Sequence, residues 1–300
     1  MPGRAVLVAN PASGRGRTAR LAAAIARRLS ARGLDVELAL TPTGDDAARA
    51  AANAIASGCD RVIVAGGDGT INSVLGALAH APAALGVIPT GMANAFAREM
   101  GIPLAFDSAC DVAAGCCQRI IDLGRTGSRH FALMAGIGFD ADVVAHVNPR
   151  LKRLTGPGAY VAAGLARALR FRPTPLEISF DHGHLTAAAL LLVAANTALY
   201  TYRWRIAPQA RPDDGLLDVV IFDCRSPLDA PAHVLGVLTG RHPRHPGVIT
   251  LRTRALRVHC ERPLPLQIDG DLAGVVPAEM EIVPGALRVL APPGRATGGS

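Results

Sequence analysis

The sequence predicts an α/β domain built on a doubly wound parallel sheet, followed by a β-sandwich domain. In the first 117 residues four apolar runs alternate with segments of helical periodicity, the pattern of a parallel sheet with crossover helices. A glycine-containing turn follows three of those runs. Beyond residue 174 several short β-like segments succeed one another with a single helical interruption, which is typical of a sandwich.

We place the α/β domain at residues 1–125 and the sandwich domain at residues 126–284, and we leave open whether the last strands, near 285–292, return to the first domain. The chain has 300 residues, of which 50% are apolar and 18% are charged. Two cores of ordinary size can therefore form, and the composition disfavours disorder.

The charge balance narrows the class of ligand. The formal net charge is +7, yet Lys152 is the only lysine, so backbone amides and arginine side chains must provide any anion binding. Aromatic residues make up 4% and no dense basic run lies among them, so we expect no nucleic-acid partner. A phosphorylated ligand or an anionic membrane surface fits better.

The cysteines, the N-terminal residues and the apolar runs indicate the cellular compartment of the protein. The six cysteines include no Cys-x-x-Cys pair, and the first residues read as a strand with no signal-peptide pattern. No apolar stretch is long and uninterrupted enough to span a bilayer. We therefore expect a cytoplasmic protein, and leave peripheral binding at the inner face of the membrane open.

Each of the first two predicted strands is followed by a polar turn, which we call a corner. Residues 5–9 form a strand typical of the centre of a parallel sheet, and the turn Asn10-Pro11-Ala12-Ser13-Gly14 precedes a helix over 18–32. Residues 35–40 form the second strand, which Thr41 ends before a helix over 44–57. Glycine at such a corner lets a bulky anion approach the backbone, although an ordinary connecting loop is the alternative.

The third corner is the most distinctive stretch of the chain. A strand over 61–65 runs into Gly66-Gly67-Asp68-Gly69-Thr70, and a helix covers 71–78. This order points backbone N–H groups and the positive end of a helix at one place. A carboxylate there repels phosphate unless a metal ion or a proton lies between them, so Asp68 indicates phosphate chemistry with Mg²⁺. The alternative is a tight turn in which Asp68 is a helix N-cap.

The fourth strand, residues 85–88, ends in Pro89-Thr90-Gly91-Met92, and a helical segment follows Asn94. A further helix covers 107–117. In doubly wound sheets ligands bind at the carboxyl ends of the strands. Because all the glycine corners lie at such ends, we expect them to form one shared site.

The second half contains two polar turns between predicted strands. Strands are expected at 131–139, 176–181, 187–195, 217–222, 247–252, 255–260 and 264–268, with helices at 160–171 and 227–238. Asp213-Asp214-Gly215 forms the first turn. The second stretch is Gln267-Ile268-Asp269-Gly270-Asp271. In an extended segment Asp269 and Asp271 would point the same way, whereas a hairpin turn is the alternative.

These stretches together resemble one family. Gly-Gly-Asp-Gly-Thr at 66–70 is similar to the signature of the diacylglycerol-kinase catalytic superfamily, which includes bacterial lipid kinases and sphingosine kinases; NAD kinases and phosphofructokinases carry a related loop. Residues 10–14 resemble its Asn-Pro-x-Ser-Gly motif, and residues 136–141, with Asp140, its Gly-x-Gly-Phe-Asp-Ala motif. Residues 89–98 resemble Pro-x-Gly-Thr-x-Asn-Asp-Phe-Ala-Arg, with Met92 and Ala95 in place of threonine and aspartate.

The resemblance implies an NAD-kinase/phosphofructokinase-like nucleotide-binding domain and a set of binding residues. It places ATP in the cleft between the domains, on Asn10, Pro11, Ala12, Ser13, Gly14, Thr41, Gly66, Gly67, Asp68, Gly69, Thr70, Ile71, Asn72, Ser73, Gly91, Met92 and Asn94. It implies a structural Mg²⁺ held by the Asp214 side chain and by the carbonyl groups of Arg211 and Leu216. Asp68, Asp269 and Asp271 are the candidate catalytic carboxylates, and Asp271 stands where the family has glutamate.

The implied reaction is transfer of the γ-phosphoryl group of ATP, with Mg²⁺, to a hydroxyl group of a lipid presented at a membrane surface. One carboxylate would take the hydroxyl proton or orient the alcohol, and the sequence does not rank the three candidates. An NAD kinase-like enzyme is one alternative. A non-catalytic lipid or nucleotide sensor is the other, because Met92 and Asp271 depart from the motifs. The acceptor lipid and the oligomeric state, a homodimer included, stay open.

Overall fold

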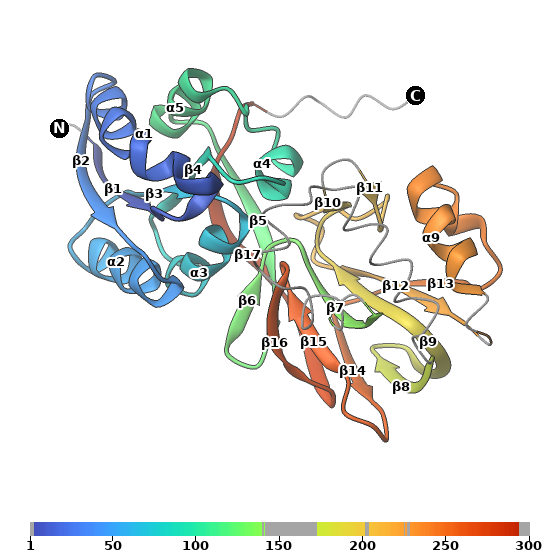
Figure 1. The fold of residues 1–300 in the computed structure, drawn as a ribbon. Coiled ribbons are helices and arrows are strands. Elements are labelled where there is room, and N and C mark those ends of the chain that lie inside the picture. The colour runs from blue at the N-terminus through green and yellow to red at the C-terminus, as the bar shows by residue number, and fades with distance from the viewer. Residues whose placement is uncertain are drawn as a thin grey trace. The chain divides into compact units, whose positions relative to one another are not determined.

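The computed structural model describes residues 3–139, 141, 173–201, 204–224, 226 and 229–293 (Figure 1). The chain divides into two compact units. Unit 1 comprises Met1–Leu123 and Val283–Ser300, and unit 2 comprises Gly124–Ile282. The helix predicted at 160–171 and the motif residue Asp140 lie outside the described residues.

Unit 1 is built on a parallel sheet with the strand order β17-β4-β3-β1-β2. Its strands are β1 (Gly3–Ala9), β2 (Leu34–Leu40), β3 (Arg61–Gly66), β4 (Ala84–Pro89) and the last part of β17 (Ala278–Leu290). Val289 of β17 pairs in parallel with Leu85 of β4, so the end of the chain returns to this sheet. The strand β5 (Gln118–Thr126) also pairs with β17.

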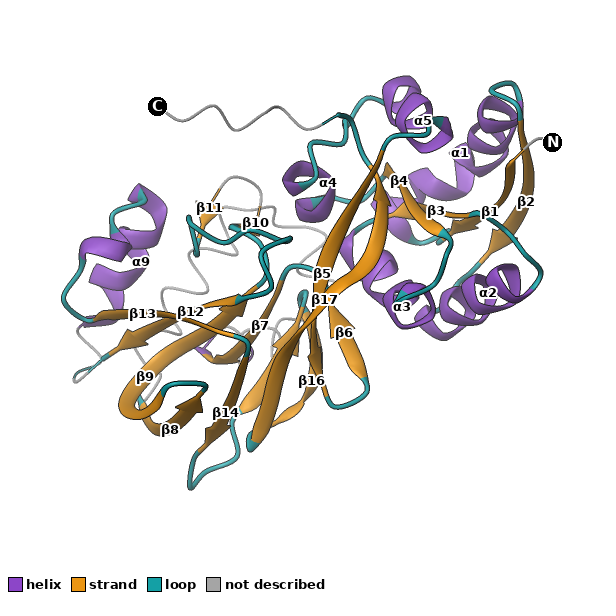
Figure 2. Cartoon of the chain, turned by 180° about the vertical axis from the view of Figure 1, so that it is seen from behind, coloured by secondary structure: helices purple, strands orange, loops and turns teal. Residues whose placement is uncertain are grey.

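Helices cover both faces of that sheet. α1 and α5 lie on one face and α2 and α3 on the other, as Figures 1 and 2 show. The helices are α1 (Ser13–Ser30), α2 (Gly44–Ala56), α3 (Asp68–Leu78), α4 (Ala95–Glu99) and α5 (Phe106–Ala114). The strands β1, β3 and β4 are apolar runs because both of their faces are buried, as with Leu7 and Ile63 at 0% exposure. The edge strand β2 is largely exposed and contains Asp35 and Glu37.

Unit 2 consists mainly of antiparallel strands. The sheet order is β16-β15-β7-β9-β8-β14-β17, and β12 pairs with both β9 and β13. The bounds are β6 (Arg129–Phe131), β7 (Met134–Gly138), β8 (Thr174–Phe180), β9 (Gly183–Ala195), β10 (Leu199–Thr201), β11 (Trp204–Arg205), β12 (Leu217–Asp223), β13 (Val248–Thr253), β14 (Ala255–His259), β15 (Pro265–Ile268) and β16 (Asp271–Val275). One α-helix, α9 (Asp229–Thr239), and a short 3₁₀ helix (His242–Arg244) lie within the described part of this unit.

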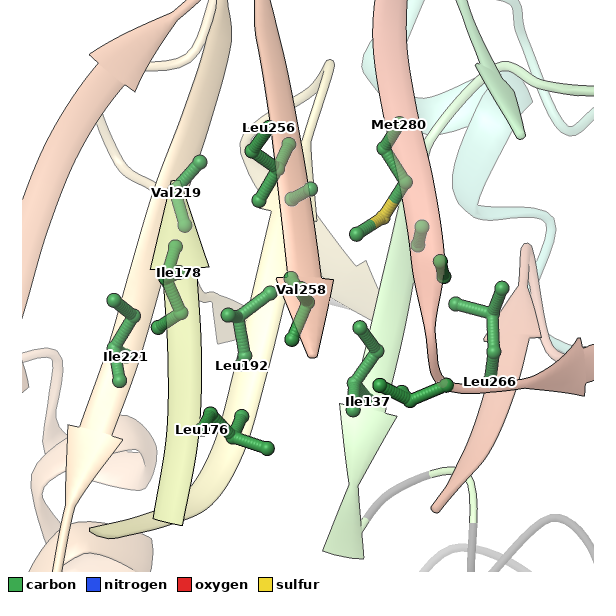
Figure 3. Close-up of a cluster of buried hydrophobic side chains, with 14 of the residues drawn as sticks. Ile137, Leu176, Ile178, Leu192, Val219, Ile221, Leu256, Val258, Leu266 and Met280 are labelled. Carbon is green, nitrogen blue, oxygen red and sulfur yellow. The ribbon is translucent and has the colours of Figure 1, made fainter. Parts of the chain in front are cut away.

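The core of unit 2 gathers side chains from strands that are far apart in the sequence (Figure 3). Leu176 and Ile178 of β8 are buried, whereas their neighbour Glu177 is exposed, which is the alternation expected of a strand with one solvated face. They belong to one cluster with Ile137 and Leu256. The predicted fold class, a doubly wound α/β domain followed by a β-sandwich domain, is confirmed.

Two of the differences from the predicted element boundaries concern the motifs. The first helix begins at Ser13, not at residue 18, so part of the predicted glycine turn is already helical. The predicted strand over 131–139 is interrupted between β6 and β7, because the backbone N–H groups of Ala132 and Leu133 bond to the side chain of Asp269 in the turn between β15 and β16. No helix in the ranges that the structure describes is long and apolar enough to cross a membrane.

Candidate active site

The three glycine corners of unit 1 meet at the carboxyl edge of its sheet. The carbonyl oxygen of Gly66, at the end of β3, accepts hydrogen bonds from the N–H groups of Thr90 (3.0 Å) and Gly91 (3.3 Å). The N–H of Asn10, after β1, donates to Ala65 O at 3.4 Å. The hydrogen bonding between the parallel strands therefore continues past the strand ends into the corners. It holds residues 10, 66 and 90–91, which are distant in sequence, next to one another.

Glycine is required where the corners touch. A Cβ on Gly91 would lie 2.5 Å from the Cα of Gly67, and a Cβ on Gly14 would lie 2.1 Å from Thr90 O. Gly14 also has a φ of +58°, in the left-handed region. The corners therefore pack backbone against backbone, and no larger residue fits at these contacts without moving the main chain.

Asp68 joins two of the corners. It is the first residue of α3, and its carboxylate accepts the N–H of Ala95 at 3.1 Å and the N–H of Phe96 at 3.0 Å. Those N–H groups begin α4, a different helix. Asp68 thus satisfies the first two N–H donors of α4. The N-cap of its own helix α3 is Gly67, so the alternative in which Asp68 caps that helix is wrong.

The remaining predicted nucleotide residues line the same edge. Asn10 Oδ1 accepts the N–H of Ala12 at 2.9 Å, and Ser73 Oγ donates to Gly69 O at 3.0 Å. Met92 is 46% exposed. The structure places the following predicted residues in or beside the three corners and the start of α3: Pro11, Ser13, Gly67, Thr70, Ile71 and Asn72.

Two buried polar atoms at this edge are left without a hydrogen-bond partner by the described part of the chain. They are Oγ1 of Thr41, which follows β2, and Oδ1 of Asn94. Asn94 has a left-handed φ of 51°, and its Nδ2 donates to Gly91 O at 3.0 Å. Because unsatisfied buried oxygens are costly, each marks a place where a bound ligand could supply a donor.

In unit 2, Asp269 lies in a hairpin turn. Asp269 and Gly270 have φ values of 48° and 90°, and the flanking residues Ile268 and Asp271 are paired between β15 and β16. Two left-handed residues between paired strands are the mark of a type I′ turn. The expectation that the segment is extended, with both acids on one side, is therefore wrong, and the hairpin alternative is correct.

The two acids of this hairpin differ in their partners. The Asp269 carboxylate accepts backbone N–H groups from Ala132 (2.8 Å), Leu133 (2.9 Å) and Met134 (3.0 Å), and Asp269 N–H donates to Met134 O at 3.0 Å. Asp271, the first residue of β16, is exposed. Its carboxylate has no hydrogen bond or ion pair with the residues that the structure describes. Of the three candidate carboxylates, Asp271 alone keeps both oxygens available.

The predicted metal-binding turn is paired with Arg252 of β13, a residue that no sequence motif indicated. Asp214 Oδ1 accepts the N–H of Leu216 at 3.2 Å, and Asp214 Oδ2 pairs with the Arg252 guanidinium. Arg252 Nε lies 3.5 Å from Asp218 Oδ2, and burial raises the pKa of Asp218. Asp218 and Arg252 are directly opposite each other in the β12–β13 ladder. No sequence pattern predicted this pairing.

Both halves of the chain match known family models. Residues 4–126 match the diacylglycerol kinase catalytic domain, and residues 134–291 match the YegS C-terminal NAD kinase beta sandwich-like domain. A diacylglycerol kinase of Mycobacterium tuberculosis strain H37Rv is 35% identical over 300 residues, covering 97% of this chain and 96% of the relative. The chain belongs to the diacylglycerol kinase family.

Further relatives agree with this membership. A probable lipid kinase YegS-like protein of Pseudomonas fluorescens is 35% identical over 277 residues, 90% of each chain. A crystal structure of a Bacillus anthracis diacylglycerol kinase shares the fold, with a TM-score of 0.74 at 20% identity, covering 97% of both chains.

The family membership decides between the functions that the sequence left open. The chain is a lipid kinase, and membership implies ATP as donor and a lipid as acceptor. The likeness to NAD kinase is confined to the description of the sandwich domain.

The contrast between the two acids of the hairpin predicts different effects on stability. In this kinase Asp269→Asn should lower the free energy of unfolding of unit 2 by about 1–3 kcal/mol, because an amide NH₂ replaces one acceptor and faces an N–H donor. Asp271→Asn should change it by less than about 0.5 kcal/mol. Urea unfolding followed by the fluorescence of the single tryptophan, Trp204, measures both. Equal losses of unfolding free energy in the two variants would contradict the structural role given to Asp269 alone.

Proposed function

We propose that this kinase transfers the γ-phosphoryl group of ATP, accompanied by Mg²⁺, to the hydroxyl group of a diacylglycerol-like lipid. The observation that carries the proposal is the interlocking of the three glycine corners at the start of α3. Such a corner offers backbone N–H groups and the positive end of a helix to a phosphate chain. Names of relatives that match nearly the whole chain support a diacylglycerol as the acceptor.

The nucleotide is proposed to bind unit 1 through its main chain. Lys152 is the only lysine of the sequence, so a lysine-based phosphate loop is not available in unit 1. The corners at 10–14, 66–70 and 90–94 supply the N–H donors instead. The unpartnered oxygens of Thr41 and Asn94 would accept donors from the nucleotide, such as a ribose hydroxyl or the adenine amino group.

Asp271 is proposed as the proton acceptor. During transfer the lipid hydroxyl oxygen forms a bond to the γ-phosphorus, the bond to the bridging oxygen of ADP breaks, and the hydroxyl proton passes to a carboxylate. The carboxylates of Asp68 and Asp269 already accept two and three backbone hydrogen bonds. They hold main chain in place, whereas the exposed Asp271 carboxylate can meet a substrate hydroxyl.

A structural Mg²⁺ is proposed at the turn between β11 and β12. One carboxylate with neighbouring backbone carbonyls is a hard-oxygen donor set of the kind that Mg²⁺ accepts. The two carboxylates of Asp214 and Asp218 share a single guanidinium from Arg252, and Asp218 Oδ2 is buried without a hydrogen bond, so the two acids are not fully paired by protein groups. The carbonyls of Arg211 and Leu216 and the Asp214 side chain would hold the ion, which would brace the turn.

Activity measurements test the assignment of Asp271. Asp271→Asn should lower kcat for transfer from radiolabelled ATP to dioleoylglycerol in mixed micelles by about 100-fold or more, with little change in KM for ATP. Glu261→Gln, an exposed carboxylate on the same unit, is the matched control and should keep full activity.

Three outcomes would count against the proposal. Asp271→Asn with activity within a few fold of wild type would remove Asp271 as the base. Transfer to NAD with none to lipid would favour the NAD kinase-like enzyme. Tight ATP binding without turnover on any lipid would favour the sensor.

Thermal unfolding tests the metal turn without reference to activity. The Tm of the wild-type protein should rise by several degrees in Mg²⁺ relative to EDTA, because an ion that binds only the folded state stabilises it. Asp214→Ala should lose this increment, and Glu261→Gln should keep it. An identical Tm of the wild type in Mg²⁺ and in EDTA would show that the turn holds no ion.

A further inference from the structure

The helix α9 of unit 2 presents an apolar face to solvent. Ala232, Leu235 and Leu238 are exposed at a spacing of three residues, which places them on one side of the helix. Leu235 is 61% exposed, more than any other large apolar side chain in the described ranges, and Leu238 is 39% exposed. Large apolar side chains gathered on one face mark a surface that something else covers.

The opposite side of α9 is firmly packed, so the exposed face has a fixed position. Ala230 and His233 are 0% and 2% exposed. The His233 ring meets the Phe222 ring edge-on, with centroids 5.3 Å apart, and His233 Nε2 lies 3.2 Å from Asp223 O. Figures 1 and 2 both show α9 beside β12 and β13.

Two positively charged residues follow the exposed leucines along the chain. Arg241 and Arg244 follow the helix, are exposed, and have no ion pair within the described part of the chain. The sequence from Ala230 to Pro246 contains no aspartate or glutamate. We call Ala232, Leu235, Leu238, Arg241 and Arg244 the α9 face; it joins apolar side chains to two unneutralised arginines.

We propose that the α9 face docks on an anionic lipid bilayer and so brings the kinase to its lipid acceptor. The inference rests on the proposed function, because a lipid substrate resides in a membrane. Leucines can enter the boundary between headgroups and acyl chains while arginines pair with lipid phosphates. The absence of acids along residues 230–246 favours an anionic bilayer over a mixed-charge protein surface as the occupant. α9 has 11 residues, which suits a helix lying on the surface.

Vesicle flotation tests the docking directly. The wild-type protein should float with vesicles of equal parts phosphatidylglycerol and phosphatidylcholine, and far less with pure phosphatidylcholine. Arg241→Gln with Arg244→Gln should weaken binding to the anionic vesicles by about 25-fold, at about 5-fold for each charge. Leu235→Gln with Leu238→Gln should abolish it. The matched controls Leu104→Gln, at an exposed leucine on unit 1, and Arg262→Gln should bind like wild type.

A second readout separates docking from catalysis. With dihexanoylglycerol, a water-soluble acceptor, the α9 variants should keep wild-type activity, whereas with dioleoylglycerol in anionic vesicles they should lose about 10-fold or more. Equal vesicle binding by wild type and variants would overturn the proposal. So would a wild-type dimer in solution that Leu235→Gln with Leu238→Gln dissociates, because a second copy would then cover the face. Wild-type inactivity toward the soluble lipid with vesicle binding intact would instead contradict the proposed function alone.

Discussion

The account depends on the contact between main chains at the glycine corners of unit 1. A Cβ on Gly91 would lie 2.5 Å from the Cα of Gly67, and a Cβ on Gly14 would lie 2.1 Å from the carbonyl oxygen of Thr90. At Gly14 and Gly91 nothing larger than hydrogen fits without moving the main chain. The missing side chains let three loops from separate βα units pack together, and they also leave the N–H groups of those loops unscreened. One constraint thus explains both the packing of the edge and its suitability for phosphate.

Two of the three candidate carboxylates hold main chain in place. Asp68 bridges from the start of α3 to the start of α4, and Asp269 fixes the gap between β6 and β7 from a hairpin turn. The donors to Asp68 belong to the motif at residues 89–98, and the donors to Asp269 lie between β6 and the start of β7. Each acid therefore fixes main chain from another part of its unit, whereas the side chain of Asp271 is exposed.

Much of the fold could be predicted because its determinants are local. Apolar runs such as residues 61–65 predict central strands, and a glycine after a strand predicts a corner. The nucleotide residues could be proposed because the resemblance covers contiguous motifs. The partners of Asp68 could not be predicted, since its carboxylate bonds to N–H groups that lie 27 and 28 residues further along the chain.

Two further features of the structure, a turn and an ion pair, also depend on contacts between residues that are distant in sequence. The turn at Asp269-Gly270 depends on which strands pair, and an Asp-Gly pair is compatible with both an extended segment and a hairpin. The ion pair of Asp214 with Arg252 depends on the β12–β13 register, in which Asp218 stands opposite Arg252. Register follows from long-range packing, which spacing along one sequence does not encode.

The central claim is that the three corners form a single nucleotide site. Amide hydrogen exchange with and without Mg²⁺ and ATP measures it most directly, because each corner is read separately. The account predicts that nucleotide slows exchange together at residues 11–14, 67–70 and 91–96. Protection of one corner alone, or of none of them while ATP binds elsewhere, would contradict it.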